Sequence, residues 1–192
     1  SANRVAALQA GAVDVAEYLS PRELSLLGNM PGVRVEQVFG NYIHRIEMQN
    51  EMPPFDDPKV RQAMNYLVPR DEIAEAVYFG TARPTKSPVS EIYPAFTGEY
   101  FEYENNVEKA KELLSEAGYP DGFEVDFTCT NNRVPGDAVV CEALAQMWSR
   151  LGLTVNAQAL NGTVFFPAAA REEYTMAMSA WGTLTGEAAY TY

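Results

Sequence analysis

Apolar and polar positions follow two recurring patterns along this chain. Apolar residues spaced three or four apart are typical of a helix that buries one face, and alternation is typical of a half-buried strand. These patterns predict helices over residues 3–10, 106–118, 136–151 and 163–173, further helices that begin near residues 20, 57 and 69, and strands over residues 13–16, 33–38, 42–49, 123–130, 153–160 and 174–181. From residue 106 onward helices and strands alternate, which predicts an α/β fold with helices covering the strands.

Two of the predicted helix starts carry a capping residue directly before a proline. Ser20 precedes Pro21 and Asp57 precedes Pro58. A short polar side chain can accept a hydrogen bond from the first helical turn, and proline is well suited to the first helical position. We therefore assign both to helix initiation rather than to chemistry.

The most regular strand pattern covers residues 123–130. Phe, Val, Phe and Cys occupy one face, while Thr128 and Thr130 are predicted to face outward. In the helix predicted over residues 163–173, Pro167 is expected to break the helix or to lie in its first turn, since proline removes a backbone donor.

The segment 81–105 fits neither pattern. It holds three prolines and five aromatic residues, namely Pro84, Pro88, Pro94, Tyr93, Phe96, Tyr100, Phe101 and Tyr103. A long loop of this composition is expected to lie pinned across a surface, and such loops are often functional. Aromatic residues that close the side of the domain itself account for the pattern as well.

The acidic composition narrows the classes of function. Acidic residues outnumber basic ones 26 to 14, for a formal net charge of -12. This excludes nucleic acid as a partner, because phosphate backbones require clusters of Lys and Arg. No apolar run approaches the ~18 residues that cross a bilayer, and the N-terminus does not have the pattern of a signal peptide. We expect a cytosolic protein or a mature or excised piece of an exported one, and the abrupt ends favour a piece.

Few residues offer catalytic or metal chemistry. The single histidine, His44, lacks the companions of a zinc site or of a Ser–His–Asp triad. No phosphate-binding glycine motif is present either, so we predict neither a metal nor any other cofactor. Cys129 and Cys141 form no CxxC pair. They are either a disulfide or two small buried apolar residues.

The residues after the last predicted strand are the best candidates for ligand contact. In open α/β sheets, ligands bind beyond the carboxyl ends of strands. Trp181 offers a flat face, Gly182 and Gly186 allow close approach to the backbone, and Glu187 offers a charge. A turn beside a core tryptophan explains the same residues equally well.

Several segments together resemble the peptide/nickel class of ABC-transporter extracellular solute-binding proteins, family 5. Residues 52–66 resemble its PPFDDxxVRQAxNY signature, residues 70–73 its following helix restart, residues 108–123 its EKAKxLLxEAGYPDGF segment, residues 8–14 its LxxGxVD, and residues 181–182 its strand end. These segments keep the family's order and cover nearly the whole chain. In this interpretation Asp57, Arg61 and Asn65 of the signature are structural.

The resemblance implies a type II periplasmic-binding-protein-like fold of two lobes, of which residues 1–192 form most of one, with a mixed sheet and flanking helices. It implies no enzyme activity. Such a protein, periplasmic or membrane-anchored, would hold a peptide, dipeptide or glutathione-like solute between this lobe and a missing second lobe. It would deliver the solute to an ABC permease in the inner membrane.

The resemblance also assigns site residues. The segment Trp181, Gly182, Thr183, Thr185, Gly186 and Glu187 would contact the solute, with Tyr42 and Asn50 as further candidates. The family's oligopeptide binders carry an aspartate for the peptide's amino terminus where this chain has Leu184. Glu187 could substitute for it, in a Thr-Gly-Glu context similar to that of glutathione- and dipeptide-type relatives.

Two other functions are compatible with the residues. One is a small hydrolase that uses Glu187 with Asp126 or another carboxylate, which would show a bell-shaped pH–rate profile. The other is a sensor or interaction lobe that contacts a signalling partner and has no role in transport.

Overall fold

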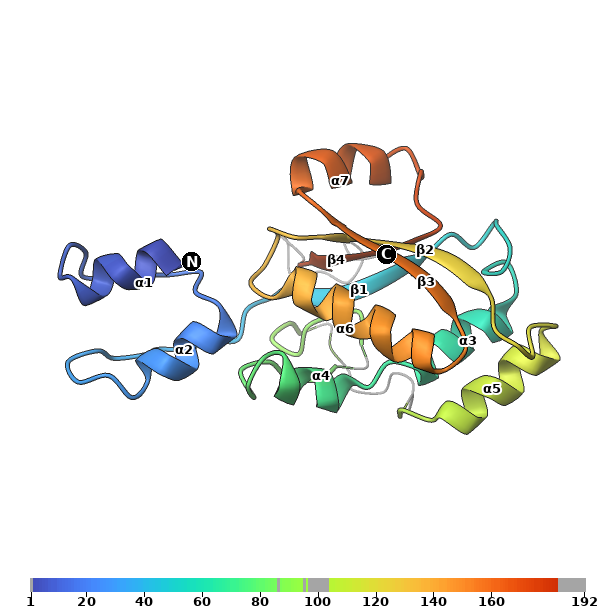
Figure 1. Cartoon of the computed structure of the whole chain (residues 1–192), viewed down its shortest axis with the longest axis horizontal. Coiled ribbons are helices and arrows are strands. Elements are labelled where there is room, and N and C mark those ends of the chain that lie inside the picture. The colour runs from blue at the N-terminus through green and yellow to red at the C-terminus, as the bar shows by residue number, and fades with distance from the viewer. Residues whose placement is uncertain (1, 86, 95, 97–103, 183–192) are drawn as a thin grey trace.

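Four strands form one mixed sheet at the centre of the structure, a computed structural model that describes residues 2–85, 87–94, 96 and 104–182 (Figure 1). The strands are β1 (Ile43–Met48), β2 (Glu124–Thr130), β3 (Thr154–Leu160) and β4 (Met176–Trp181), in the spatial order β1-β4-β2-β3. The strands β2, β3 and β4 are parallel, and β1 pairs antiparallel with β4. The mixed sheet confirms the predicted α/β class.

Helices cover both faces of the sheet. The covering helices are α3 (Pro58–Tyr66), α4 (Arg70–Ala76), α5 (Val107–Glu116), α6 (Asp137–Arg150) and α7 (Gly162–Ala169), while α1 (Ala2–Gln9) and α2 (Pro21–Leu27) lie away from the sheet. In Figure 1, α6 lies against one face with α3, α4 and α5 on the same side, and α7 lies across the opposite face. The helices α6 and α7 make the crossovers that join the parallel strands.

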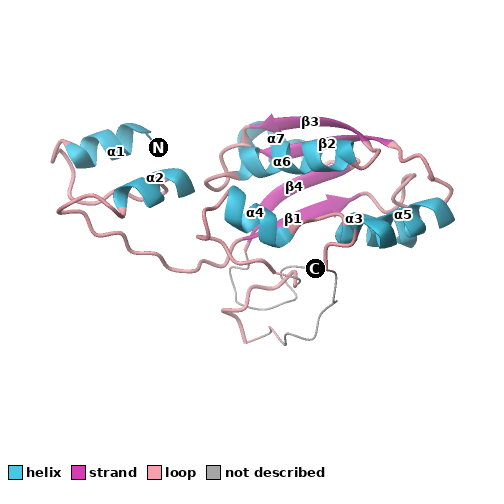
Figure 2. Ribbon diagram, turned by 60° about the horizontal axis from the view of Figure 1, so that its bottom comes forward, coloured by secondary structure: helices cyan, strands magenta, loops and turns pink. Residues whose placement is uncertain are grey.

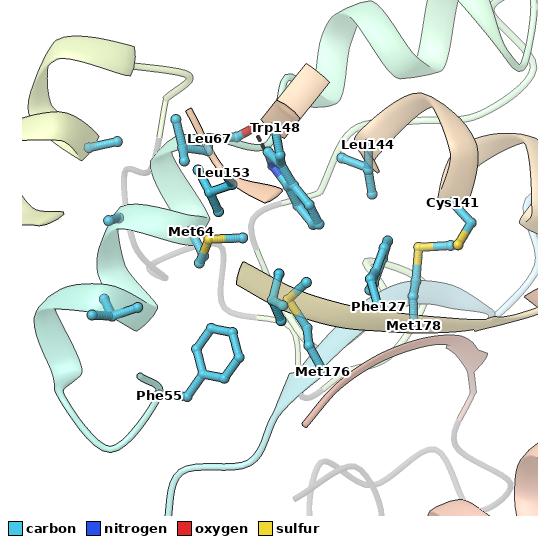
Figure 3. Packing of buried hydrophobic residues seen from close by; sticks show 14 of the residues in the cluster. Phe55, Met64, Leu67, Phe127, Cys141, Leu144, Trp148, Leu153, Met176 and Met178 are labelled. Atoms are coloured by element: carbon cyan, nitrogen blue, oxygen red, sulfur yellow. Dashed lines mark hydrogen bonds between the residues drawn. The ribbon is translucent and has the colours of Figure 1, made fainter. Parts of the chain in front are cut away.

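The apolar core lies between the sheet and α3, α5 and α6 (Figure 3). Its largest side chain is Trp148, which is fully buried, packs against Phe127 at 5.1 Å between ring centroids, and donates its indole N–H to the carbonyl oxygen of Leu67 at 3.0 Å. Phe55 is also fully buried and meets Phe123 edge to face. This cluster anchors the end of the sheet at which the parallel strands begin.

The predicted helix starts are confirmed in detail. Ser20 forms a capping box with Glu23 at the start of α2, and the Asp57 side chain accepts a hydrogen bond from the Lys59 backbone at the start of α3. Arg61 donates to the carbonyl oxygens of Phe55 and Asp56, which agrees with its structural assignment.

Two predicted strands are wrong. Residues 13–16 and 33–38 form neither helix nor strand and pair with no strand among the described residues. Alternating residues form a stable strand only beside a neighbour that satisfies their backbone groups. Both segments belong to the N-terminal region with α1 and α2, which stands apart from the sheet (Figures 1 and 2). Val15 is accordingly 81% exposed and Val38 88% exposed.

Two further expectations are corrected near α7. Thr128 and Thr130 point away from the main core but are buried, because β2 is a central strand and α7 lies across this face. Pro167 neither breaks α7 nor lies in its first turn, because the helix continues through it to Ala169.

The structure also decides between the alternatives that the sequence left open for the cysteines. Cys129 near the end of β2 and Cys141 in α6 form a disulfide, and both are buried. The described residues of the segment 81–105 form no helix or strand before α5, and part of that segment is pinned: Val89 is fully buried and Ser87 and Ser90 nearly so.

Candidate functional site

Three parallel strands end at the same edge of the sheet. The chain leaves β2 for β3 on one side and returns as β4 on the other. The carboxyl ends of β2 and β4 therefore flank a switch in strand order, which is where open α/β sheets bind ligands. Because β1 is antiparallel to β4, its start lies at this edge as well, with Ile43 opposite Trp181.

The positively charged side chain of Arg133 lies at this switch point. Arg133 lies in the loop that follows β2, and its Nε donates to the carbonyl oxygen of Ala180 in β4 at 3.3 Å. Its guanidinium carbon lies 4.9 Å from the ring centroid of Tyr42, just before β1, and 5.5 Å from that of Phe166 in α7. Arg133 is exposed, so its charge faces outward between two aromatic rings.

The loop that carries Arg133 is held by hydrogen bonds. The buried Asp137 carboxylate accepts the backbone N–H of Arg133 at 2.9 Å and that of Val134 at 3.4 Å. Asn132 accepts the backbone N–H of Gly162 at 2.8 Å, which ties the loop to the first residue of α7. The starts of α6 and α7 thus both lie at the edge where the parallel strands end.

Trp181 and Gly182 lie at this edge, at the end of β4. Trp181 is half-buried, and the guanidinium carbon of Arg45 lies 4.6 Å from its ring centroid. A Cβ on Gly182 would lie 3.0 Å from the Asn41 side chain. The close neighbour of this glycine is therefore the protein's own Asn41, and the ligand approach expected there stays a prediction.

The remaining predicted site residues are not all brought together. Thr183, Thr185, Gly186 and Glu187 lie outside the described residues. Tyr42 is 48% exposed at the edge beside Arg133. Asn50 follows β1 at the opposite end of the sheet, eight residues beyond Tyr42, which corresponds to about 26 Å of extended chain.

A cavity of about 1020 Å³ extends from this edge along β1. Its described lining includes β1, α4, residues 37–40 and parts of the segment 81–96, and it reaches Tyr42 and Ala180 at the edge. The rim segments contact each other: Gln37 donates to the carbonyl oxygen of Thr81 at 2.5 Å. Its volume is at the upper end of the range for small-ligand sites, roughly 300–1,000 Å³.

The cavity wall contains an uncharged polar pair. The Tyr78 hydroxyl lies 2.6 Å from Nε2 of His44. Burial lowers the pKa of His44, and the nearby Asp137 opposes that shift only in part. Burial, with a smaller contribution from Asp137, raises the pKa of Tyr78 far above its ordinary value. Both groups are therefore neutral at pH 7 and can offer hydrogen bonds but no charge.

Reasoning from the sequence missed Arg133 and Phe166. A signal for Arg133 exists, because Asn131-Asn132-Arg133 directly follows the most regular predicted strand. The rule that directs ligands to the carboxyl ends of strands applies to this loop as well as to the one after β4. Phe166 carries no comparable signal, since an aromatic residue inside an apolar helix is ordinarily core.

A switch point with an exposed arginine, two aromatic rings and a nearby cavity makes this edge the candidate small-molecule site of the α/β lobe. The family model described as "Bacterial extracellular solute-binding proteins, family 5 Middle" matches residues 1–192. The chain therefore belongs to this family. The described residues contain no helix that is long and apolar enough to cross a membrane.

Individual relatives support this assignment. The chain is 32% identical over 187 residues to heme-binding protein A of Haemophilus influenzae, covering 96% of this chain and 34% of the relative. It is 30% identical over 161 residues to the glutathione-binding protein GsiB of Salmonella typhimurium, covering 82% and 30%. The structure superposes on the ABC transporter-associated periplasmic binding protein DppA of Helicobacter pylori, in complex with the peptide STSA, with a TM-score of 0.87 and 25% identity, covering 100% and 37%.

These comparisons bear on two earlier expectations. The chain spans about a third of the length of the relatives it matches. The relatives are named as binding proteins, which confirms the prediction of no enzyme. The hydrolase alternative is not supported, since Asp126 lies on an exposed strand face and accepts a hydrogen bond from Asn156 at 3.1 Å.

Proposed function

We propose that this chain is the solute-contacting part of the binding protein of an ABC importer. It captures a peptide or peptide-like small solute, such as a dipeptide or a glutathione-like molecule, between its lobe and a second lobe of the same protein. It then delivers the solute to a permease in the inner membrane. The protein works in the periplasm or anchored outside the membrane, and residues 1–192, with the long loop 81–105, serve as one lobe.

The observation that carries the proposal is the position of Arg133. A guanidinium group held between two aromatic rings at the switch point of an acidic protein is suited to bind a carboxylate, which it can contact through two parallel hydrogen bonds. The Nη atoms of Arg133 donate no hydrogen bond within the described part of the chain. They are therefore available to the carboxyl terminus of a peptide or to a carboxylate of glutathione.

Other site residues have supporting roles in this proposal. Tyr42 supplies aromatic surface beside Arg133, Trp181 lies against Arg45 at the same edge, and Gly182 keeps the end of β4 close to Asn41. Four residues that follow Gly182 in the sequence remain predicted solute contacts, namely Thr183, Thr185, Gly186 and Glu187. Asn50 has no role at this edge and would need the second lobe to reach the solute.

The test is a binding screen on the natural full-length protein. Calorimetry would compare glutathione, a set of dipeptides and the tetrapeptide Ser-Thr-Ser-Ala, each as the free acid and as the carboxyl-terminal amide. We expect binding of at least one free acid and a loss of affinity of about 10- to 150-fold in the Arg133→Ala variant, since a charge-assisted hydrogen bond contributes about 1.5–3 kcal/mol.

The amides provide the matched control. For amidated probes, Arg133→Ala should change the affinity less than twofold, because the carboxylate that the guanidinium would contact is gone. Equal losses for acids and amides would contradict the assignment of Arg133 to the carboxylate. If no peptide binds, the solute class itself is wrong.

A further inference from the structure

The disulfide brackets the loop that carries Arg133. Cys129 is the next-to-last residue of β2, and Cys141 is the fifth residue of α6. Both are buried in the core, as Figure 3 shows for Cys141. The bond therefore fixes the end of β2 relative to the start of α6, and the loop spans the interval between them.

The loop has no apolar anchor of its own. None of the residues 131–136 is buried, and all of them are described. Its position instead depends on polar contacts, above all on the two backbone N–H groups that donate to Asp137. Because Asp137 is the first residue of α6, the loop follows any displacement of the start of that helix.

The contacts of the Arg133 side chain are sensitive to such a displacement. The hydrogen bond from Nε to the Ala180 carbonyl oxygen, at 3.3 Å, is slightly longer than the usual range of about 2.7–3.2 Å. The two aromatic contacts come from other parts of the chain, Tyr42 just before β1 and Phe166 in α7. A binding group must be held within about 0.5 Å of its working position to keep its affinity.

We propose that the Cys129–Cys141 disulfide is a positioning element of the solute site: it holds the loop 131–136 so that Arg133 meets the solute carboxylate. The inference rests on the proposed function, because it assigns the disulfide an effect on affinity that passes through Arg133. A disulfide with a purely structural role would stabilise the fold and leave the affinity of the folded protein unchanged.

A double-mutant cycle on the natural full-length protein tests this. Affinity for the free-acid probe that binds in the screen would be measured by calorimetry with and without Cys129→Ala/Cys141→Ala, in both the parent and the Arg133→Ala background. We expect removal of the disulfide to weaken binding about tenfold in the parent and less than twofold in the Arg133→Ala background. Equal loss in the two backgrounds overturns the proposal.

A second variant and a control guard against a general loss of stability. Cys129→Val/Cys141→Ala fills more of the core volume than the double alanine variant. It should give the same affinity changes in the parent and in the Arg133→Ala background. Val60→Ala removes a fully buried group from α3, at the other end of the sheet, and should lower stability without changing affinity. A loss of affinity in Val60→Ala as large as that in the cysteine variants overturns the proposal.

Hydrogen exchange separates this proposal from the proposed function, because it needs no solute. Without the disulfide, the amides of Arg133 and Val134 should exchange about ten times faster, while those of α3 keep their rates. Unchanged exchange in the loop overturns the positioning role even if peptides bind. Faster exchange with no binding of any peptide supports the positioning of the loop and counts against the solute class alone.

Discussion

The two ends of the central sheet each carry a tryptophan and an arginine, but these side chains differ in burial and in hydrogen bonding. At the end where the parallel strands begin, Trp148 is fully buried with its N–H bonded to Leu67, and Arg61 donates to two backbone carbonyl oxygens. At the end where they finish, Trp181 is half-buried, and Arg133 is exposed, lies near the rings of Tyr42 and Phe166 and donates one hydrogen bond to the protein. Residue type therefore does not by itself separate the structural role of Arg61 from the binding role that we propose for Arg133. For the two arginines the difference lies in their donors, since Arg61 donates to two backbone carbonyl oxygens and Arg133 donates through Nε to one.

The largest expected change in stability comes from a substitution at the end of the sheet where the parallel strands begin. Trp148→Ala should lower the free energy of unfolding by about 3–5 kcal/mol, because it leaves a cavity and deprives a buried carbonyl oxygen of its donor. Urea denaturation measures the loss. Trp148→Phe, which keeps most of the volume, should lose less. A loss below about 1 kcal/mol for the alanine variant would show that this end is not the anchor of the fold.

The next effect compares the two arginines directly. Arg61→Met should destabilise the protein by about 1–3 kcal/mol, since it leaves the carbonyl oxygen of Phe55 without its donor. Arg133→Met should change stability by no more than about 0.5 kcal/mol, as expected for an exposed side chain. Thermal and urea unfolding measure both losses, and each arginine variant serves as the control for the other. Similar losses in both would contradict the contrast between the two ends.

The smallest expected effect is on the pH dependence of stability and involves His44. This residue lies on β1 opposite Ala180, next to the pair Ile43 and Trp181 at the edge. Burial lowers the pKa of His44 in the folded state, so the unfolded state binds the additional proton. Stability should therefore fall as the pH decreases below about 6.5, by at most about 1.4 kcal/mol per pH unit, until the lowered pKa of the folded state is reached.

The variant His44→Gln keeps a polar side chain without a titrating ring. It should remove this part of the pH dependence, as measured by unfolding free energies between pH 4 and 8. An unchanged slope in the variant would indicate that other groups carry the dependence and that burial does not extend this far toward the site.

Much of the fold could be predicted from local pattern. The caps at Ser20 and Asp57, the helix at 107–116 and the strand at 124–130 follow from short-range chemistry and appear as expected. The strands expected over 13–16 and 33–38 share the same kind of alternation and do not form. A strand depends on a neighbour far away in the sequence, and the alternating pattern says nothing about whether that neighbour exists.

The site was predicted less completely for a related reason. The segment after β4 was predicted because a tryptophan and glycines stand out in the sequence, whereas Arg133 is one of 14 basic residues and is marked only by its position after the predicted strand 123–130. Its contacts with Tyr42 and Phe166 appear only in the tertiary structure, at the switch point between β2 and β4. The sequence left the pairing of the cysteines open because spacing does not fix their geometry.

The sequence by itself determined the α/β class, most helices and strands, and the family to which the chain belongs, since these depend on periodicity, capping residues and contiguous motifs. Only the tertiary structure decided the strand order, the disulfide, the burial of Thr128 and Thr130, and the meeting of Arg133 with two aromatic rings. Each of these depends on contacts between residues distant in the chain, and local propensity carries no information about such contacts.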